Sequence, residues 1–197
     1  HLILLKPYKK VNAMILGIPN VGKSTIINTL AKRVIAKTGN EPAVTKGQQR
    51  IALDLDIVLW DTPGFLWPKL EPPSRAYRLA VTGAIKASVI DFEDVAYFLV
   101  DALRQAYPGQ LAACFDIPAD LPDTISVMDA IATRRACFKT GKAINYHRVS
   151  ELLLNKYRQG GLGRISLETP EMIEQERLAY AFVLAEKEEK LFYMRYF

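Results

Sequence analysis

The sequence predicts an α/β domain over residues 1–86 followed by an all-α domain over residues 87–197. Short apolar runs, bounded by glycine and other loop-forming residues, dominate the first part and are typical of strands. After Ser74 the apolar residues recur every three or four positions, which is the spacing of one helix face. We therefore expect the strands to give way to helices near the end of the first domain.

Four segments define the α/β domain. Val11–Leu16 is a short apolar run that ends at a glycine, and the helix-forming run Lys23–Arg33 follows it. Ile51–Leu55 alternates between apolar and polar residues, whereas Ile57–Trp60 is continuously apolar. These two runs predict an outer strand and an inner strand that are joined by a tight turn. Between the helix and the strands, residues 38–49 are polar and rich in loop formers, which indicates a surface loop.

Composition indicates a soluble, cytoplasmic protein. Half of the 197 residues are hydrophobic, but no apolar run approaches the twenty residues that a membrane-spanning helix needs. No signal-peptide pattern is present. The only cysteines, Cys114 and Cys137, lie in dissimilar surroundings, so we expect two free thiols in a reducing compartment.

Residues 17–24, GIPNVGKS, match the phosphate-binding pattern G-x-x-x-x-G-K-[ST] between a predicted strand and a predicted helix. Glycine lets the backbone amides turn toward phosphate oxygens, and the positive end of the helix points at the same place. Lys23 is predicted to reach the outer phosphates, and Ser24 to bind Mg²⁺. The predicted nucleotide-binding residues of this loop are Pro19, Asn20, Val21, Gly22, Lys23, Ser24 and Thr25.

A second motif, Asp61-Thr62-Pro63-Gly64, follows the inner strand. That position predicts that Asp61 reaches the Mg²⁺ and that the Gly64 amide reaches the γ-phosphate. Thr45 in the polar loop is the expected third Mg²⁺ ligand, and Thr38 is the alternative. We therefore predict Lys23, Thr45 and Gly64 as catalytic residues.

Five segments together resemble the bacterial ribosome biogenesis GTPase A family: GIPNVGKST, AKTG-x-x-PAVTKGQQ, LWDTPGFLWPK, RLAVTGAIK and KYRQGGLGRIS. The resemblance covers about residues 11–168. It implies a circularly permuted GTPase domain that hydrolyses GTP to GDP and phosphate, and a helical domain that binds the large ribosomal subunit during its assembly. It also implies binding to ribosomal RNA and proteins. We expect no membrane partner and a monomer.

The motif Asn-Lys-x-Asp, which reads guanine, is absent from the chain. The permutation implied by the family places this motif before the phosphate-binding loop. Asn155-Lys156-Tyr157-Arg158 lacks the required aspartate and falls in a predicted helix, so we reject it. Two explanations stay open: a stretch missing between Leu5 and Lys6, or a short N-terminal tail. A P-loop ATPase therefore remains an alternative.

Two residues bear on the rate of hydrolysis. Phe65 follows the second motif, where signalling GTPases hold the glutamine that positions water, and an apolar side chain cannot do this. We therefore expect low intrinsic activity and an additional catalytic group from an ion, another segment or the ribosome. Asn20 occupies the position that binds K⁺ in related GTPases with such a replacement. The alternative is that Asn20 only stabilises the loop.

Residues 132–166 hold eight positive side chains against Glu151 alone, a local net charge of +7, whereas the whole chain has +5. Together with the family resemblance, this excess of positive charge indicates that the segment binds RNA phosphates. The alternative is that these side chains are only exposed to solvent. Tyr146 and Tyr157 are better explained by packing than by stacking on bases. An RNA-binding module with a passive nucleotide site is the alternative function. The predicted RNA-binding residues are Arg134, Arg135, Lys139, Lys142, Lys156, Arg158 and Arg164.

Overall fold

The computed structural model describes residues 11–33, 35, 48–53, 57–85 and 91–196. The junction between Leu5 and Lys6, the threonines at 38 and 45, and the turn before Ile57 lie outside the described residues. The chain forms two units. The first unit takes the described residues up to Pro68 together with residues 82–85, and the helical unit takes the remainder.

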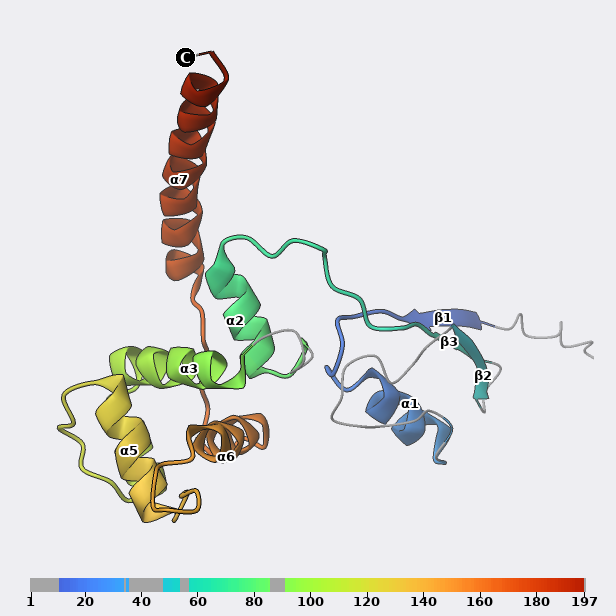
Figure 1. Cartoon of the computed structure of the whole chain (residues 1–197). Helices are drawn as coiled ribbons and strands as arrows, with labels where there is room; N and C mark the ends of the chain where they lie inside the picture. Colours follow the sequence, from blue (N-terminus) through green and yellow to red (C-terminus); the bar gives the residue numbers. More distant parts are fainter. Residues whose placement is uncertain (1–10, 34, 36–47, 54–56, 86–90, 197) are drawn as a thin grey trace, which may run out of the picture. The chain divides into compact units, whose positions relative to one another are not determined.

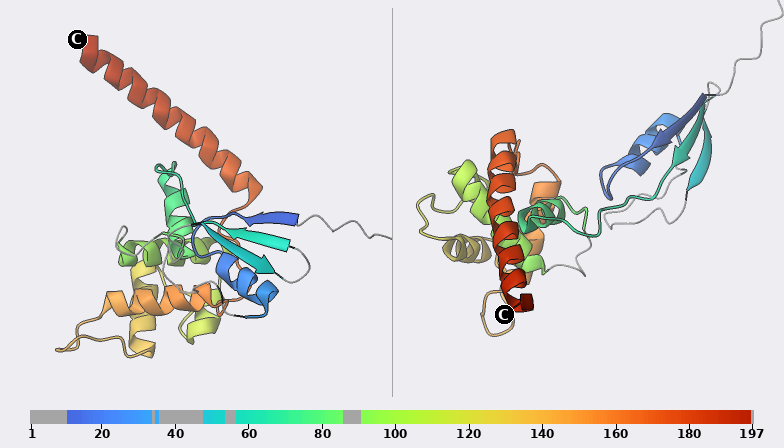
Figure 2. Two further views of the ribbon diagram at one scale, coloured as in Figure 1. Left: turned by 90° about the vertical axis from the view of Figure 1, so that its right-hand side faces the viewer. Right: turned by 90° about the horizontal axis from the view of Figure 1, so that it is seen from above.

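The first unit is built on a three-stranded sheet of the described residues, in the order β1-β3-β2 (Figure 1). Strand β1 (Val11–Ile15) pairs in parallel with β3 (Ile57–Asp61), and β2 (Gln49–Leu53) pairs antiparallel with β3. The predicted outer and inner strands are thus confirmed, with β3 in the middle. Figure 2 shows helix α1 (Lys23–Ala31) against one face of this sheet.

The core of the first unit lies between α1 and the sheet. Ile27 of α1 packs with Ile51 and Leu59, and these three side chains are buried. Val58 of β3 is also buried, but several other apolar residues in or next to these elements are exposed. Five of these apolar residues are more than half exposed: Val11, Met14, Leu16, Ile26 and Leu30.

The helical unit contains six helices among the described residues. They are α2 (Pro73–Val81), α3 (Phe92–Ala106), α4 (Gln110–Phe115), α5 (Thr124–Arg134), α6 (Tyr146–Arg158) and α7 (Pro170–Tyr196). Carboxylate and amide side chains begin three of them, because each accepts a bond from an otherwise unpaired amide of the first turn. These are Asp91 for α3, Asp123 for α5 and Asn145 for α6.

The apolar residues at helical spacing form the core of the helical unit. Leu99 and Leu103 of α3, Met128 and Ile131 of α5, and Leu153 of α6 are fully buried. Loop-forming residues follow two of these helices: α3 ends just before Tyr107-Pro108-Gly109, and α6 ends shortly before Gly160-Gly161. Both cysteines are free thiols, as expected. Cys137 is buried and Cys114 is half-buried.

Helix α2 belongs to the helical unit, which differs from the predicted domain boundary at residue 86. The ring of Tyr77 stacks on Phe98 of α3 with centroids 5.3 Å apart. The guanidinium of Arg158 in α6 donates to the carbonyls of Ala80 and Val81 at 2.9 Å. Apolar spacing predicts that a helix has a buried face, but it does not indicate which core that face fills.

Helix α7 begins close to Arg78, which is only 8% exposed. The Arg78 guanidinium donates to both carboxylate oxygens of Glu176, at 2.9 and 2.5 Å, and to the carbonyl of Leu167 at 2.9 Å. Glu176 holds the pKa of Arg78 above its usual value through these hydrogen bonds. The ion pair therefore joins α7 to α2.

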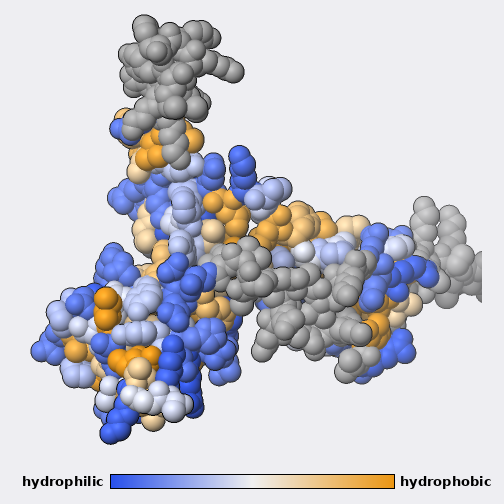
Figure 3. All heavy atoms as spheres, in the orientation of Figure 1, coloured by the Kyte–Doolittle hydropathy of each residue, from blue (hydrophilic) through white to orange (hydrophobic). Residues whose placement is uncertain are grey.

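Exposed apolar side chains are spread over the described part of α7, as Figure 3 shows. The apolar side chains of α7 that the structure describes are exposed or half-buried, so they do not form one buried face. No helix among the described residues combines the length and the apolar composition needed to cross a membrane.

Replacing Arg78 with alanine is expected to destabilise the helical unit by about 2 kcal/mol, because Glu176, whose side chain is 25% exposed, and the Leu167 carbonyl lose their hydrogen bonds to a buried cation. Urea unfolding followed by circular dichroism measures the change. The matched control is Arg177→Ala, which removes an exposed ion pair with Glu174 and should leave the midpoint unchanged. Equal destabilisation by both substitutions would contradict a special role for the buried arginine.

Candidate nucleotide-binding site

The loop between β1 and α1 is shaped by two residues with positive φ. Gly22, which precedes the first residue of α1, has φ 87°, and Asn20 has φ 58°. Glycine adopts this left-handed conformation without steric cost, and asparagine is among the few other residues that tolerate it. The loop therefore turns sharply into α1, whose first amides have no carbonyl partners within the helix.

Lys23 folds back over this loop. Its side chain is only 9% exposed, and its ammonium donates to the carbonyls of Gly17 at 3.1 Å and Ile18 at 2.8 Å. Burial lowers the pKa of Lys23, and the carboxylate of Asp61 raises it by a smaller amount. A partly desolvated cation is thus held at the N-terminal end of α1, where the helix dipole also favours an anion.

Asp61 lies at the same edge of the sheet because β1 and β3 run in parallel. It is the last residue of β3, pairs in register with Ile15 at the end of β1, and is fully buried. The hydroxyl of Thr62 donates to the Ile15 carbonyl at 2.7 Å. This hydrogen bond ties the start of the second motif to the strand from which the phosphate-binding loop departs. Sequence reasoning gave Thr62 no role.

Gly64 makes the closest approach of the second motif to the loop. A methyl group at this position would lie 2.7 Å from the backbone nitrogen and Cα of Pro19 and 2.9 Å from the Lys23 ammonium. No side chain fits at such distances, so only glycine allows this approach. The structure therefore brings together Pro19, Lys23, Asp61 and Gly64, which the sequence had predicted as one site.

The remaining predicted residues of the loop lie around this group. Ser24 follows Lys23 on the first turn of α1 and is half-buried, whereas Val21 and Thr25 are exposed. Thr45, the expected third Mg²⁺ ligand, and its alternative Thr38 lie outside the described residues. Their roles stay predictions.

Asn20 has a partner that sequence reasoning missed. Its side-chain amide donates to the carbonyl of Gly83 at 2.9 Å, and Gly83 is buried with φ 84°. Gly83 lies in the segment RLAVTGAIK, which is one of the five segments that resemble the family. Nothing in the sequence indicated that this segment contacts the phosphate-binding loop. This hydrogen bond favours a loop-stabilising role for Asn20.

Phe65 and Trp67 follow Gly64 on the surface of the first unit. Both rings are mostly exposed, and they meet edge to face with centroids 6.4 Å apart. The Phe65 ring has no group that orients water by hydrogen bonding.

The predicted RNA-binding residues lie in different environments. Arg134 forms an ion pair with Asp116, and the cations of Arg135 and Lys156 lie over the ring of Phe115, at 5.7 and 5.6 Å from its centroid. Arg158 binds the carboxyl end of α2, as described above. The exposed members without such a described contact are Lys139, Lys142 and Arg164.

A strand, a glycine-containing loop and a helix that begins at a lysine, beside an aspartate at the end of the adjacent parallel strand, define a P-loop nucleotide-binding protein. The chain belongs to the 50S ribosome-binding GTPase family, whose sequence pattern matches residues 12–129.

Several relatives agree with this assignment. The chain is 45% identical over 168 residues to ribosome biogenesis GTPase A of Bacillus pumilus, covering 85% of this chain and 59% of that protein. It is also 45% identical over 163 residues to the protein of the same name from Bacillus cereus, covering 83% and 55%. The chain thus spans a little over half the length of the curated relatives it matches.

Solved structures of YlqF have a similar fold. GNP-bound YlqF from T. maritima superposes with a TM-score of 0.57 at 27% identity, over 81% of this chain and 59% of that one. The GDP-bound form matches with a TM-score of 0.59 at 23% identity, over 83% and 63% of the two chains.

Replacing Gly64 with alanine is expected to push the second motif away from Pro19. We expect the preference for a nucleoside triphosphate over its diphosphate to fall about tenfold, the effect of losing one hydrogen bond to a charged group. Titrations monitored by tryptophan fluorescence measure both affinities. Gly109→Ala is the control, since it strains a positive φ in the helical unit with nothing nearby to clash. An unchanged preference in Gly64→Ala would refute the close approach.

Proposed function

We propose that this protein binds GTP and hydrolyses it to GDP and phosphate, as part of a factor that drives assembly of the large ribosomal subunit in the cytoplasm. The observation that supports this most directly is the Lys23 ammonium, held at the start of α1 beside buried Asp61 and close to Gly64. Family membership and the relatives named ribosome biogenesis GTPase A support the base and the cellular role.

Phosphate binding follows from the loop. The amides that begin α1 point at the bound anion, and the Lys23 ammonium exchanges its two loop carbonyls for phosphate oxygens. Because those carbonyls hold the ammonium in place beforehand, little side-chain entropy is lost when phosphate arrives. The Gly64 amide is proposed to donate to the γ-phosphate, which would make this segment sensitive to the presence of that group.

The residues present fit a Mg²⁺ ion. The Ser24 hydroxyl and the Asp61 carboxylate are hard oxygen ligands, which Mg²⁺ prefers, and Thr45 is proposed to complete the set. When bound, Mg²⁺ neutralises charge on the β- and γ-phosphate oxygens. Asp61 is fully buried at the end of β3, and its carboxylate interacts electrostatically with the Lys23 ammonium.

Hydrolysis is an in-line attack of water on the γ-phosphate. Phe65 does not orient this water, so the intrinsic rate is low and the ribosome or an ion accelerates it. A K⁺ ion would need the side-chain oxygen of Asn20, whereas the bond to Gly83 uses the amide nitrogen. Binding of K⁺ would therefore use the side-chain oxygen of Asn20, and stabilisation of the loop uses its side-chain nitrogen.

The first unit is proposed to be part of a circularly permuted GTPase domain, followed by an all-α domain. The exposed apolar residues of β1 and α1 support a further contact surface on this unit, because parallel strands are normally covered on both faces. In the permuted order, the segment that reads guanine precedes β1.

Two other functions make different predictions. A passive nucleotide site in an RNA-binding module would not need Lys23, Asp61 and Gly64 to converge. A P-loop ATPase would use the same phosphate contacts with another base.

Replacing Lys23 with alanine is expected to weaken GTP binding by roughly tenfold to a hundredfold, since it removes charged hydrogen bonds to phosphate. Titration of a fluorescent GTP analogue measures the affinity, and unlabelled GTP and ATP as competitors report the base preference. Lys69→Ala, which removes an exposed lysine, is the matched control. Stronger competition by ATP than by GTP would refute the proposed base.

The same variant separates a switch from a passive site. With large ribosomal subunits and enough GTP to saturate the variant, we expect Lys23→Ala to bind the subunits but not to be released, because hydrolysis no longer relaxes the loops. Sedimentation of the protein with the subunits measures release over time. Release at the wild-type rate would favour the passive module.

Potassium dependence tests Asn20. If K⁺ assists hydrolysis, we expect single-turnover rates at least about tenfold faster in KCl than in NaCl, as for other charges that stabilise the transition state. Asn20→Asp keeps a side-chain oxygen and tolerates the positive φ, so it should retain the K⁺ effect, whereas Asn20→Ala should lose it. Equal rates in both salts would leave Asn20 with the loop-stabilising role alone.

A further inference from the structure

The segment between α5 and α6 forms a short, ordered turn. Phe138 pairs with Ile144 in an isolated antiparallel bridge, and the Lys139 amide donates to the Ala143 carbonyl at 2.7 Å. The Lys142 amide donates back to the Lys139 carbonyl at 3.1 Å, and Gly141 supplies the positive φ of 92° that this tight turn needs. We call residues 138–144 the basic turn.

Both ends of the basic turn are fixed to the helical core. Cys137 is fully buried, and its amide donates to the Ala132 carbonyl of α5 at 2.8 Å. Its carbonyl accepts from the Asn145 amide at 2.9 Å. The side chain of Asn145 in turn caps α6 by accepting from the Arg148 amide at 3.2 Å. The turn therefore presents its side chains on a rigid support, which reduces the entropy lost on binding.

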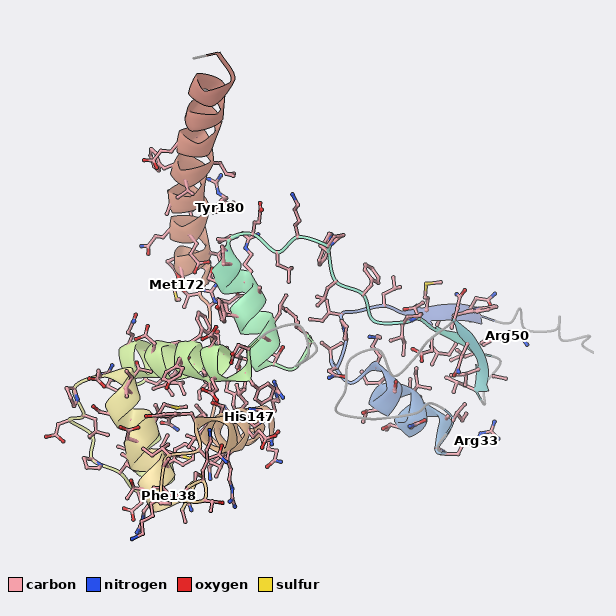
Figure 4. All side chains as sticks on the ribbon, viewed as in Figure 1. Arg33, Arg50, Phe138, His147, Met172 and Tyr180 are labelled. Atoms are coloured by element: carbon pink, nitrogen blue, oxygen red, sulfur yellow. The ribbon has the colours of Figure 1, made fainter. Side chains whose placement is uncertain are left out.

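An aromatic ring stands at the base of this turn. Phe138 is 40% exposed and lies beyond the C-terminal end of α5, as Figure 4 shows. Within the described part of the chain, no other aromatic ring stacks on it. Tyr146 and Tyr157 were not expected to stack on bases: Tyr146 donates to Asp129 at 2.7 Å, which raises its pKa to about 12, and Tyr157 is half-buried.

The charge around Phe138 has a single sign along the chain. Residues 130–150 include no aspartate or glutamate, while Lys139 and Lys142 extend from the basic turn into solvent. Arg134 and Arg135 lie at the C-terminal end of α5, just before the basic turn. Arg134 forms an ion pair with Asp116, the residue that follows α4. An exposed ring between cations is a poor surface for an apolar partner and a good one for a polyanion with flat, unpaired groups.

We propose that the basic turn binds single-stranded RNA, with Phe138 stacking on an unpaired base and Lys139 and Lys142 binding the flanking phosphates. This inference rests on the proposed function in ribosome assembly. We propose single-stranded RNA because its unpaired bases can stack on aromatic side chains. Bases inside an A-form duplex are already stacked on one another, and the major groove of that duplex is too deep and narrow for side chains to read.

The test compares two RNA probes on the full chain: a hairpin with an unpaired purine loop, and a duplex of the same length. Phe138→Leu keeps the apolar volume but removes the π-face, so we expect about tenfold weaker binding to the loop RNA and no change for the duplex. Phe138→Trp should retain the loop affinity. Phe182→Ala, a change at a 73% exposed ring on α7, is the matched control and should have no effect.

The lysines are tested through salt. Lys139→Ala should weaken binding to both probes and reduce the slope of log affinity against log salt by about one, because one phosphate contact is lost. Phe138→Leu should leave that slope unchanged. A slope that is unaffected by Lys139→Ala would overturn the phosphate contact.

Several outcomes would overturn the inference as a whole. These are wild-type loop affinity in Phe138→Leu, equal losses for loop and duplex, or lost binding to ribosomal subunits with RNA affinity intact, which would indicate a protein partner. GTP titration of each variant separates these failures from failure of the proposed function: GTP affinity that stays intact while RNA binding fails rejects only the basic turn.

Discussion

The parallel pairing of β1 with β3 is the constraint on which the site depends. It aligns Ile15 with Asp61, so the phosphate-binding loop and the second motif leave the sheet at one edge. The Thr62 hydroxyl bond to Ile15 then fixes the direction of departure, and Gly64 allows contact with Pro19. The Lys23 ammonium at the start of α1 and the buried Asp61 carboxylate are therefore brought close together by the pairing of the strands.

Positive charge serves two purposes in the helical unit. Arg78 and Arg158 hold helices together: one binds Glu176 of α7, and the other binds the last carbonyls of α2. Their planar guanidinium groups suit this, because several N–H donors satisfy several acceptors at once. Lys139 and Lys142 instead extend into solvent from a turn with a rigid base. Charge that is already hydrogen-bonded within the protein is less available to a partner than charge at the surface.

The two units differ in how far their apolar residues are covered. In the helical unit, the residues at helical spacing on α3, α5 and α6 meet in one buried core. In the first unit, α1 covers one face of the sheet through Ile27, while Val11 and Met14 of β1 stay exposed. The core of the first unit is therefore smaller than that of the helical unit.

The strands, the main helices and the phosphate-binding motifs were predictable from local sequence, because they depend on the spacing of apolar residues and on glycines whose backbone freedom the loop requires. The sequence also predicted that Lys23, Asp61 and Gly64 belong to one site. Only the tertiary structure assigned α2 to the helical unit, Asn20 to Gly83, Arg158 to the end of α2 and exposure to Phe138. Those outcomes depend on which surfaces and hydrogen-bond acceptors, far apart in the chain, become neighbours after folding, and periodicity does not contain that information.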